Sequence, residues 1–287
     1  MQNIRYSILT QFRKLLRYPI LENAIYLISQ IQGLNEFASK LAPGNNLYKR
    51  NSIRNVKRKD INYALDISDY QNWLIYFGIT KDNPVGLFEL IKKNDIIIDI
   101  GTNIGQTAMT FAKLGGENAQ ILGFEPDPVN YSKATTNLQL NSFKNIQYFN
   151  IGIGSKTEEL NLKINSVSNR GGNRIDKSNG SDSFPIKVDT LDNIIQSLQI
   201  KNVHLIKIDI EGFEFEALKG ATETIRKHKP VLYIEIDDDN LKDQGSSAKE
   251  VIGFIQTFNY KIEDSITKII INEHSHVEHS HFDIICS

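Results

Sequence analysis

A short apolar run that leads into two glycines constrains this 287-residue chain more than any other stretch. Residues 95–100 read Asp-Ile-Ile-Ile-Asp-Ile, and Gly101 and Gly105 follow. Such a run is typical of a strand buried in a parallel sheet, and the glycines predict a tight turn that opens a helix. Glycines let a ligand approach the backbone, and the free amides of a helix N-terminus attract negative charge. We therefore expect a small ligand at this turn.

The spacing of the turn narrows the class of ligand. Dinucleotide sites carry Gly-x-Gly-x-x-Gly, whereas residue 103 is asparagine here. The pattern Asp-x-Gly-x-x-x-Gly over residues 99–105 is closer to the turn of S-adenosylmethionine (SAM) sites. Asp99, at the end of the strand, suits a ligand with an ammonium group or hydroxyls.

Strand and helix patterns alternate after this turn, which predicts a doubly wound α/β domain. In such a sheet the chain order reverses after the third strand, so that the fourth strand lies beside the first. We therefore expect Asp209, at the end of the fourth strand, to face Gly101. The expected strands cover residues 96–100, 120–124, 146–149, 203–208, 231–236, 260–262, 268–271 and 282–286.

The ends of the second and third strands supply further candidates. Glu125 follows Gly101 by 24 residues, about the separation at which an acid closing the next strand binds both hydroxyls of a ribose. Its neighbours are Pro126 and Asp127, and Asp127 is the better residue to cap the next helix. Asn150 and Ile151 end the third strand, where a side chain and exposed backbone can meet an adenine edge.

The fourth strand ends in a group of charges, Lys207, Asp209 and Glu211. Charges at the end of a buried strand are costly unless they are paired, so these residues could simply satisfy one another. The alternative is a catalytic role, with Asp209 as the base and the other two orienting it or the acceptor.

The alternation is interrupted over residues 154–188, where two stretches of alternating hydrophobicity predict a two-stranded excursion. Between them lies a polar loop over residues 165–183 that contains Arg170 and Arg174. Long loops inside compact domains are usually functional or disordered. One interpretation is a substrate lid whose two arginines bind phosphate, carboxylate or sugar oxygens, and the other is a solvated loop.

Residues 1–60 differ in character from the rest and are expected to form a basic helical extension, with the main domain over residues 61–287. The extension holds eleven Lys and Arg against three acidic residues, about +8, which leaves about −9 for the remainder. Two helices separated by Pro19 are expected, and the first carries an apolar stripe. The simplest interpretation is a helical cap or dimer contact, and the alternative is a peripheral helix on an anionic membrane. The stripe consists of Ile8, Leu9, Phe12, Leu15 and Leu16.

Several functional classes are disfavoured. The basic run over residues 49–59 lacks interleaved aromatics, so it predicts a linker rather than a nucleic-acid surface. One cysteine, Cys286, excludes an internal disulfide and fits a reducing compartment, so a cytoplasmic location is expected. The histidines 274, 276, 279 and 281, with Glu273 and Glu278, favour a solvated turn over a metal site, and no metal is expected.

Taken together, these motifs resemble the FkbM family of SAM-dependent methyltransferases over roughly residues 68–237. The resemblance implies a class I methyltransferase fold, which is Rossmann-like, with a seven-stranded, mostly parallel sheet whose last strand is antiparallel. The family commonly has alanine where Thr102 stands. The matching stretches are Asp99-Ile-Gly-Thr-Asn-Ile-Gly105, Glu125-Pro126, Asn150-Ile151-Gly152, Thr190-Leu191-Asp192 and Ile206-Lys-Ile-Asp-Ile-Glu-Gly-Phe-Glu214.

The resemblance implies methyl transfer from SAM, often to a hydroxyl of a sugar or a secondary metabolite. The glycine turn (Gly101, Thr102, Asn103, Gly105) with Asp99 is then expected to hold the methionine end, and Glu125 the ribose. Two alternatives stay open at this point: a catalytically silent module that keeps the cofactor fold, and a nicotinamide-dependent oxidoreductase, which Asn103 disfavours.

Overall fold

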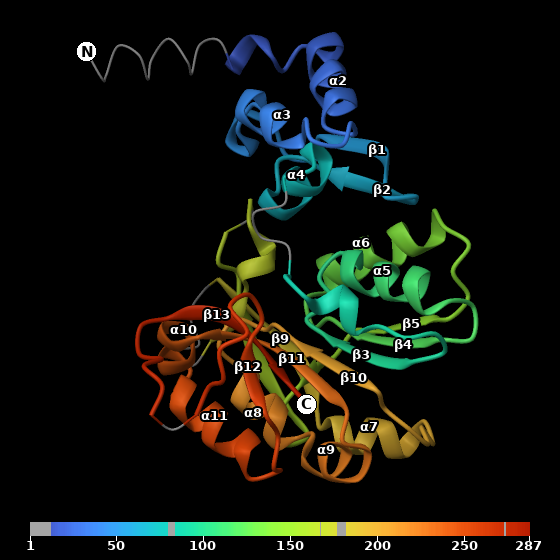
Figure 1. The fold of residues 1–287 in the computed structure, drawn as a ribbon. Coiled ribbons are helices and arrows are strands. Elements are labelled where there is room, and N and C mark those ends of the chain that lie inside the picture. Colours follow the sequence, from blue (N-terminus) through green and yellow to red (C-terminus); the bar gives the residue numbers. More distant parts are fainter. Residues whose placement is uncertain (1–12, 80–83, 167, 177–181, 273) are drawn as a thin grey trace. The chain divides into compact units, whose positions relative to one another are not determined.

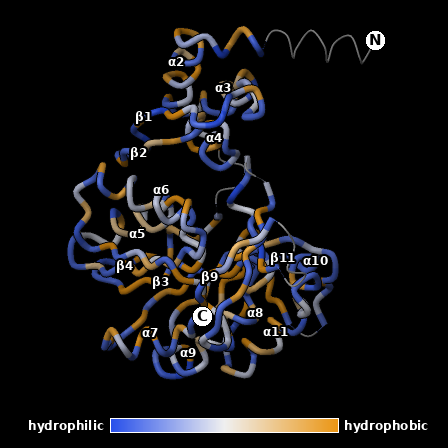
Figure 2. The backbone as a smooth tube through the Cα atoms, turned by 180° about the vertical axis from the view of Figure 1, so that it is seen from behind, coloured by the Kyte–Doolittle hydropathy of each residue, from blue (hydrophilic) through white to orange (hydrophobic). Residues whose placement is uncertain are grey.

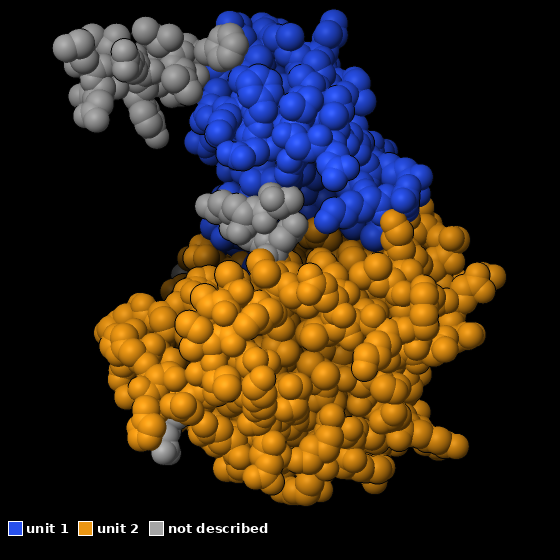
Figure 3. Space-filling view, viewed as in Figure 1, with its two compact units in different colours: residues 1–83, 166–171 blue, residues 84–165, 172–287 orange. Residues whose placement is uncertain are grey.

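The structure is a computed structural model that describes residues 13–79, 84–166, 168–176, 182–272 and 274–287. The chain divides into two compact units (Figure 3). The first comprises residues 1–83 and 166–171, and the second comprises residues 84–165 and 172–287. The segment 166–171 therefore belongs to a different unit from the chain on either side of it.

The described part of the first unit combines short helices with a β-hairpin. The break predicted at Pro19 is confirmed, because Pro19 is the first residue of a helix. At this position a backbone N–H has no partner within the helix, so the N–H that proline lacks is not needed. Ile8, Leu9 and Phe12 of the predicted stripe lie outside the described residues. The elements are α2 (Pro19–Ile28), α3 (Asn35–Leu41), η1 (Asn45–Leu47), β1 (Ile53–Arg58), β2 (Ile61–Asp66) and α4 (Tyr70–Phe77).

The basic run over residues 49–59 is not a linker, and that prediction is wrong. Most of it forms β1, which pairs antiparallel with β2. The two residues between the strands, Lys59 and Asp60, have φ of 46° and 63°, as a tight type I′ turn requires. The sequence boundary placed at residue 60 thus falls inside a hairpin.

A buried carboxylate docks α2 onto the rest of the first unit. Glu22 is 2% exposed. Its oxygens accept hydrogen bonds from Arg54 Nε (2.7 Å) and Nη2 (3.2 Å) on β1 and from the Tyr76 hydroxyl (3.1 Å) on α4. The ring of Tyr26 stacks on that of Tyr76, with centroids 5.1 Å apart. The face of α2 that packs inward is therefore largely polar.

A seven-stranded sheet forms the centre of the second unit (Figure 1). Its strands are β3 (Ile96–Ile100), β4 (Gln120–Phe124), β5 (Ile146–Phe149), β10 (Leu205–Ile208), β11 (Val231–Asp237), β12 (Ile262–Asp264) and β13 (His281–Cys286). Their order is β12-β13-β11-β10-β3-β4-β5, and β13 runs antiparallel to both neighbours. The placement of β10 beside β3 is confirmed, and the sheet is the class I methyltransferase sheet that the resemblance implies.

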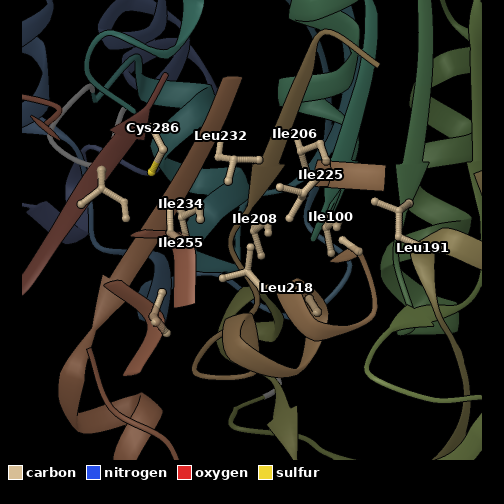
Figure 4. Packing of buried hydrophobic residues seen from close by; sticks show 14 of the residues in the cluster. Ile100, Leu191, Ile206, Ile208, Leu218, Ile225, Leu232, Ile234, Ile255 and Cys286 are labelled. Atoms are coloured by element: carbon tan, nitrogen blue, oxygen red, sulfur yellow. The ribbon is translucent and has the colours of Figure 1, made fainter. Parts of the chain in front are cut away.

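Helices cover both faces of this sheet because successive strand residues point to opposite sides. Ile97 packs with Phe111 of α5 on one face. Ile98 and Ile206 pack on the other face with residues of α7, α8, α9 and α11, several of which Figure 4 shows. The strands themselves are strongly hydrophobic (Figure 2). The helical elements are η2 (Leu87–Leu90), α5 (Gln106–Gly115), α6 (Pro128–Gln139), α7 (Leu191–Ser197), α8 (Glu214–Lys219), α9 (Thr222–His228), α10 (Asp238–Asp243) and α11 (Ala248–Gln256).

The predicted excursion is present and larger than expected. β7 (Glu158–Lys163) and β9 (Ser183–Asp189) pair antiparallel, as the alternating pattern predicts. β6 (Gly152–Ile153) and β8 (Arg174–Ile175) extend them to a four-stranded sheet. The arginine of β8 is thereby held at a sheet edge.

Two details near the C-terminus differ from the sequence-based predictions. The apolar run over residues 268–271 is not a strand, because only Ile270 makes a bridge, to Glu263. The histidine-rich segment ends in β13, which begins at His281.

No helix in the described part of the chain is long and apolar enough to cross a membrane.

Candidate functional site

The carboxyl ends of three neighbouring parallel strands meet at one edge of the central sheet. Lys207 of β10 lies opposite Asp99 of β3, which lies opposite Gly123 of β4. The glycine turn, the turn at Glu125 and the turn at Asp209 therefore leave the sheet side by side. Ligands of doubly wound sheets bind at this kind of switch point between strands.

The two glycines of the first turn are required by the protein itself. Gly101 has φ +85°, and an added Cβ would lie 1.9 Å from the carbonyl oxygen of Asp209. Gly105 has φ +87°, and its Cβ would lie 2.5 Å from the hydroxyl of Tyr148. The expectation that Asp209 lies beside Gly101 is confirmed. At each glycine, the atoms that leave no room for a side chain belong to the protein and not to a ligand.

The two residues between these glycines link the first turn to the next strand. The Thr102 hydroxyl is buried and donates to the carbonyl of Asp99 at 3.0 Å. Asn103 has φ 52°, and its backbone N–H donates to Glu125 Oε2 at 2.8 Å. Asn103 thus occupies a left-handed conformation that asparagine tolerates well.

Glu125 joins the first and second turns. Its other oxygen, Oε1, accepts a hydrogen bond from the N–H of Asp127 at 2.9 Å. Burial raises the pKa of Glu125 to about 7, although the two backbone donors act in the opposite direction. A carboxylate has about four acceptor positions, so capacity for two further donors, such as vicinal hydroxyls, remains at Glu125.

The neighbours of Glu125 hold this turn in place. Asp127 caps α6, as predicted, by accepting a hydrogen bond from the N–H of Val129 at 2.8 Å. The side-chain amide of Asn150 donates to the carbonyls of Glu125 (2.8 Å) and Pro126 (3.0 Å). Ile151 is half-buried and packs against the core. The ends of β4 and β5 are therefore fastened together at the position expected for a nucleoside.

Lys207 is the centre of the charges on the other side of the glycine turn. Its ammonium donates to the carbonyl of Gly101 (3.1 Å) and lies 3.1 Å from Asp209 Oδ2 and 3.5 Å from Asp99 Oδ1. Burial alone would lower the pKa of Lys207, but Asp209 and Asp99 outweigh it and raise the pKa above its ordinary value. Lys207 is therefore a permanent cation that fixes both carboxylates.

The two carboxylates beside Lys207 differ in access. Asp99 is fully buried, and burial raises its pKa. The side chain of Asp209 is 45% exposed. Asp209 can therefore meet a substrate directly, whereas Asp99 faces Lys207 within the protein.

Glu211 and Arg174 form a second pair at this edge. Glu211 has φ 57°, and its Oε2 accepts a hydrogen bond from the Asn240 amide at 3.1 Å and lies 3.7 Å from Arg174 Nη2. Burial and the nearby Asp209 raise the pKa of Glu211 to about 7. Arg170 belongs to the first unit, where its N–H donates to Asp69. The two predicted arginines are thus divided between the units.

Sequence patterns assign no role to Glu214 or His281, which also lie at this edge. Glu214 is 1% exposed and accepts hydrogen bonds from the N–H groups of Ile210 (3.0 Å) and Gly212 (3.1 Å), which shapes the turn after Asp209. A carboxylate at the start of α8 was the available signal. His281 contacts Glu235 at 3.0 Å, and this contact raises the pKa of His281 to about 9.

The histidines of the C-terminal segment point to separate partners. His276 pairs with Glu278, His279 with Asp239, and His281 with Glu235. In the described ranges no group of three or more His, Cys, Asp and Glu side chains is arranged to hold a metal ion. Glu273 lies outside these ranges.

Comparison with known proteins adds a family to this geometry. Hexuronic acid methyltransferase AglP from Haloferax volcanii is 25% identical over 140 residues, 49% of this chain and 55% of AglP. 2-O-methyltransferase NoeI from Sinorhizobium fredii is 24% identical over 188 residues, 60% of this chain and 76% of NoeI. The chain thus spans little more than half of AglP.

A solved structure with detectable similarity is that of methyltransferase FkbM from Methylobacillus flagellatus. It has a TM-score of 0.46 and 16% identity, and the alignment covers 95% of this chain and 60% of that chain. Residues 99–262, more than half of the chain, match the family described as the methyltransferase FkbM domain. The matched range includes the glycine turn, Glu125 and the turn after Lys207, and this chain belongs to the methyltransferase FkbM domain family.

Proposed function

We propose that the chain is a SAM-dependent methyltransferase that methylates a hydroxyl of a sugar, a glycan or a related small metabolite. The observation that carries this proposal is the meeting of three strand ends, with Glu125 on one side of the glycine turn and the exposed Asp209 on the other. Family membership agrees with it, and the names of AglP and NoeI describe methylation of a hexuronic acid and of a 2-hydroxyl.

The residues at the glycine turn fit the nucleoside end of SAM. Glu125 keeps acceptor capacity for the two ribose hydroxyls, because its two hydrogen bonds to backbone amides use about half of its acceptor positions. Asn150, at the end of the neighbouring strand, binds the backbone carbonyl of Glu125, and Ile151 follows it. The proposed residues of the cofactor site are Gly101, Thr102, Asn103, Gly105, Glu125, Pro126, Asn150 and Ile151, with Asp99 behind the turn.

Asp99 serves the cofactor site in a different way from the one its position in the sequence implies. Because Asp99 is fully buried, we propose that it acts through Lys207 and the backbone of the turn. Lys207 donates to the carbonyl of Gly101, so the Asp99–Lys207 pair fixes the path of the chain where the methionine end would bind. Asp99 and Lys207 are then positioning residues.

When bound, SAM supplies an electrophilic methyl group, so the chain must mainly orient the acceptor and remove its proton. A hydroxyl is a poor nucleophile until its proton leaves. We assign Asp209 as the base that accepts this proton, because its carboxylate is exposed and is held through Oδ2 by Lys207. Glu211, whose own carboxylate lies beside Arg174, orients the acceptor.

Arg174 is the proposed contact for anionic or hydroxyl oxygens of the acceptor. Its Nη1 lies 3.7 Å from Asp243, and its Nη2 lies 3.7 Å from Glu211. These separations exceed ordinary hydrogen-bond lengths, so the planar guanidinium keeps donors for a carboxylate or phosphate. Arg170, which belongs to the first unit, stays a separate sequence-based prediction of an acceptor contact.

The test combines cofactor binding with transfer. Calorimetry of the full chain should show binding of SAM and no binding of NAD, and Glu125→Gln should weaken SAM roughly tenfold, because an amide accepts fewer hydroxyl donors. Methyl-labelled SAM should then label a member of a panel of sugars that includes hexuronic acids. Tight binding of NAD, or SAM affinity untouched by Glu125→Gln, would contradict the proposed site.

A further inference from the structure

α2 of the first unit packs with the opposite polarity from an ordinary surface helix. Its inward face carries Glu22, Ile25, Tyr26 and Ser29, which share one side of the helix at spacings of three and four residues. Glu22 and Ser29 on this face are buried and bonded to arginines of β1. A surface helix usually turns its apolar stripe to the core and its polar residues to water.

The outward face of α2 is apolar. Ile20, Ala24 and Leu27 lie at i, i+4 and i+7, opposite the buried face. Ile20 is 84% exposed and Leu27 is 54% exposed. Figure 2 shows the hydrophobic residues of this helix in orange. Further exposed large apolar side chains follow α2 in the chain, those of Ile31 and Leu34 between α2 and α3 and that of Phe37 on α3.

We propose that the stripe on α2 (Ile20 and Leu27), together with Ile31, Leu34 and Phe37, binds the surface of an anionic lipid bilayer. Interfacial helices place an apolar stripe, often with aromatic residues, into the region between headgroups and acyl chains. Several large apolar side chains exposed within so short a segment mark a candidate interaction site on a protein surface.

Charge decides between a membrane and a second copy of the chain. Residues 1–60 carry about +8, and exposed basic residues such as Lys14 and Arg17 directly precede α2. Two such segments face to face would repel each other, whereas anionic headgroups attract each basic residue near the surface by about 1 kcal/mol. The stripe and the charge together therefore fit a lipid surface.

The test uses sedimentation of the full chain with vesicles of phosphatidylcholine alone or mixed with phosphatidylglycerol. The chain should sediment with the anionic vesicles, and added salt should weaken the binding because it screens the headgroups. The variant Ile20→Gln/Leu27→Gln should lower the partition coefficient roughly tenfold or more, because glutamine side chains gain little from insertion into the apolar part of the bilayer. Unchanged circular dichroism checks its folding.

A matched control uses two equally exposed isoleucines of the second unit, Ile266 (65%) and Ile269 (66%). The variant Ile266→Gln/Ile269→Gln should bind vesicles as well as the wild type. Failure of the wild type to bind anionic vesicles, or an equal loss in both variants, would overturn the proposal. So would a dimer, seen by light scattering, that only the α2 variant dissociates. None of these readouts depends on methyl transfer, so the proposed function is tested separately.

Discussion

Each unit of the chain buries a small charged cluster, and the two clusters differ in one respect. In the first unit, Glu22 is enclosed by Arg54 and Tyr76, and its side chain is 3% exposed. In the second unit, Lys207 is 5% exposed, but the side chain of its partner Asp209 is 45% exposed. Only the second cluster offers a carboxylate to a ligand.

This difference separates a structural charge cluster from a candidate catalytic one. The Glu22 cluster docks a helix, and the carboxylate accepts hydrogen bonds from Arg54 and Tyr76 of the same unit. The Lys207 cluster lies where three strand ends meet, and it joins a buried carboxylate, Asp99, to an exposed one, Asp209. Buried groups with shifted pKa values, such as Lys207 and Asp99, often lie at active sites.

The largest expected effect comes from Lys207→Met. It removes the cation between Asp99 and Asp209 and leaves Asp99 buried without it, so we expect a loss of about 3–5 kcal/mol in the free energy of unfolding. Urea unfolding followed by far-UV circular dichroism measures it. The double variant Lys207→Met/Asp99→Asn should recover part of the loss. A loss below about 1 kcal/mol in the single variant would mean that the pair contributes little.

Gly101→Ala tests the close approach that brings Asp209 to the glycine turn. The new Cβ would lie 1.9 Å from the Asp209 carbonyl oxygen, and residue 101 has a φ of +85°. We therefore expect the free energy of unfolding to fall by about 2–4 kcal/mol. Gly253→Ala on α11 is the control, because nothing lies within 4 Å of its Cβ. It should gain about 0.5–1 kcal/mol. Equal effects of both substitutions would contradict the described turn.

Glu22→Gln tests whether the first cluster is only structural. Arg54, whose side chain is 35% exposed, can regain water when it loses its partner, so we expect a loss of about 1–3 kcal/mol. The single tryptophan, Trp73, lies in α4 of this unit, so its fluorescence reports the transition. Methyl transfer should stay within twofold of the wild type, roughly the scatter of such assays. A large fall in turnover would remove the distinction between the clusters.

Glu214→Gln should change the pH dependence of stability in the second unit. Burial raises the folded-state pKa of Glu214 from 4.5 to about 7. The folded state then holds the proton more tightly than the unfolded state, so this contribution is complete below pH 4.5 and is lost as the pH rises through about 7.

The glutamine keeps an acceptor but does not titrate. Between about pH 5 and pH 8, the free energy of unfolding should therefore fall by about 1–2 kcal/mol less in the variant than in the wild type. Urea unfolding at several pH values measures the difference. Parallel pH profiles would show that Glu214 keeps its proton, or lacks it, in both states.

Much of the sheet follows from the sequence because its strands are buried on both faces. Residues 96–100 and 205–208 are mostly branched apolar residues, each run interrupted by one charged residue, and their chain order in a doubly wound fold predicts that β10 lies beside β3. The juxtaposition of Asp209 and Gly101 follows from these two facts alone.

The parts that were not predicted depend on contacts distant in sequence. β1 is rich in charged residues, so its sequence does not show a strand pattern. The turn after it is Lys-Asp rather than the usual Asn-Gly. The apolar run at residues 268–271 has no neighbouring strand along its whole length. The burial of Asp99 cannot be read from its place near a strand end, because it depends on the strands that the fold puts on either side, β10 and β4.

The most direct measurement of the central claim is the turnover and the SAM affinity of Asp209→Asn. Because the amide cannot accept the acceptor's proton, we expect kcat to fall by about 10²–10⁴, with the dissociation constant of SAM within about threefold of the wild type. Isothermal titration and single-turnover methyl transfer give the two quantities separately. Full turnover with normal SAM affinity would contradict the assignment of Asp209 as the base.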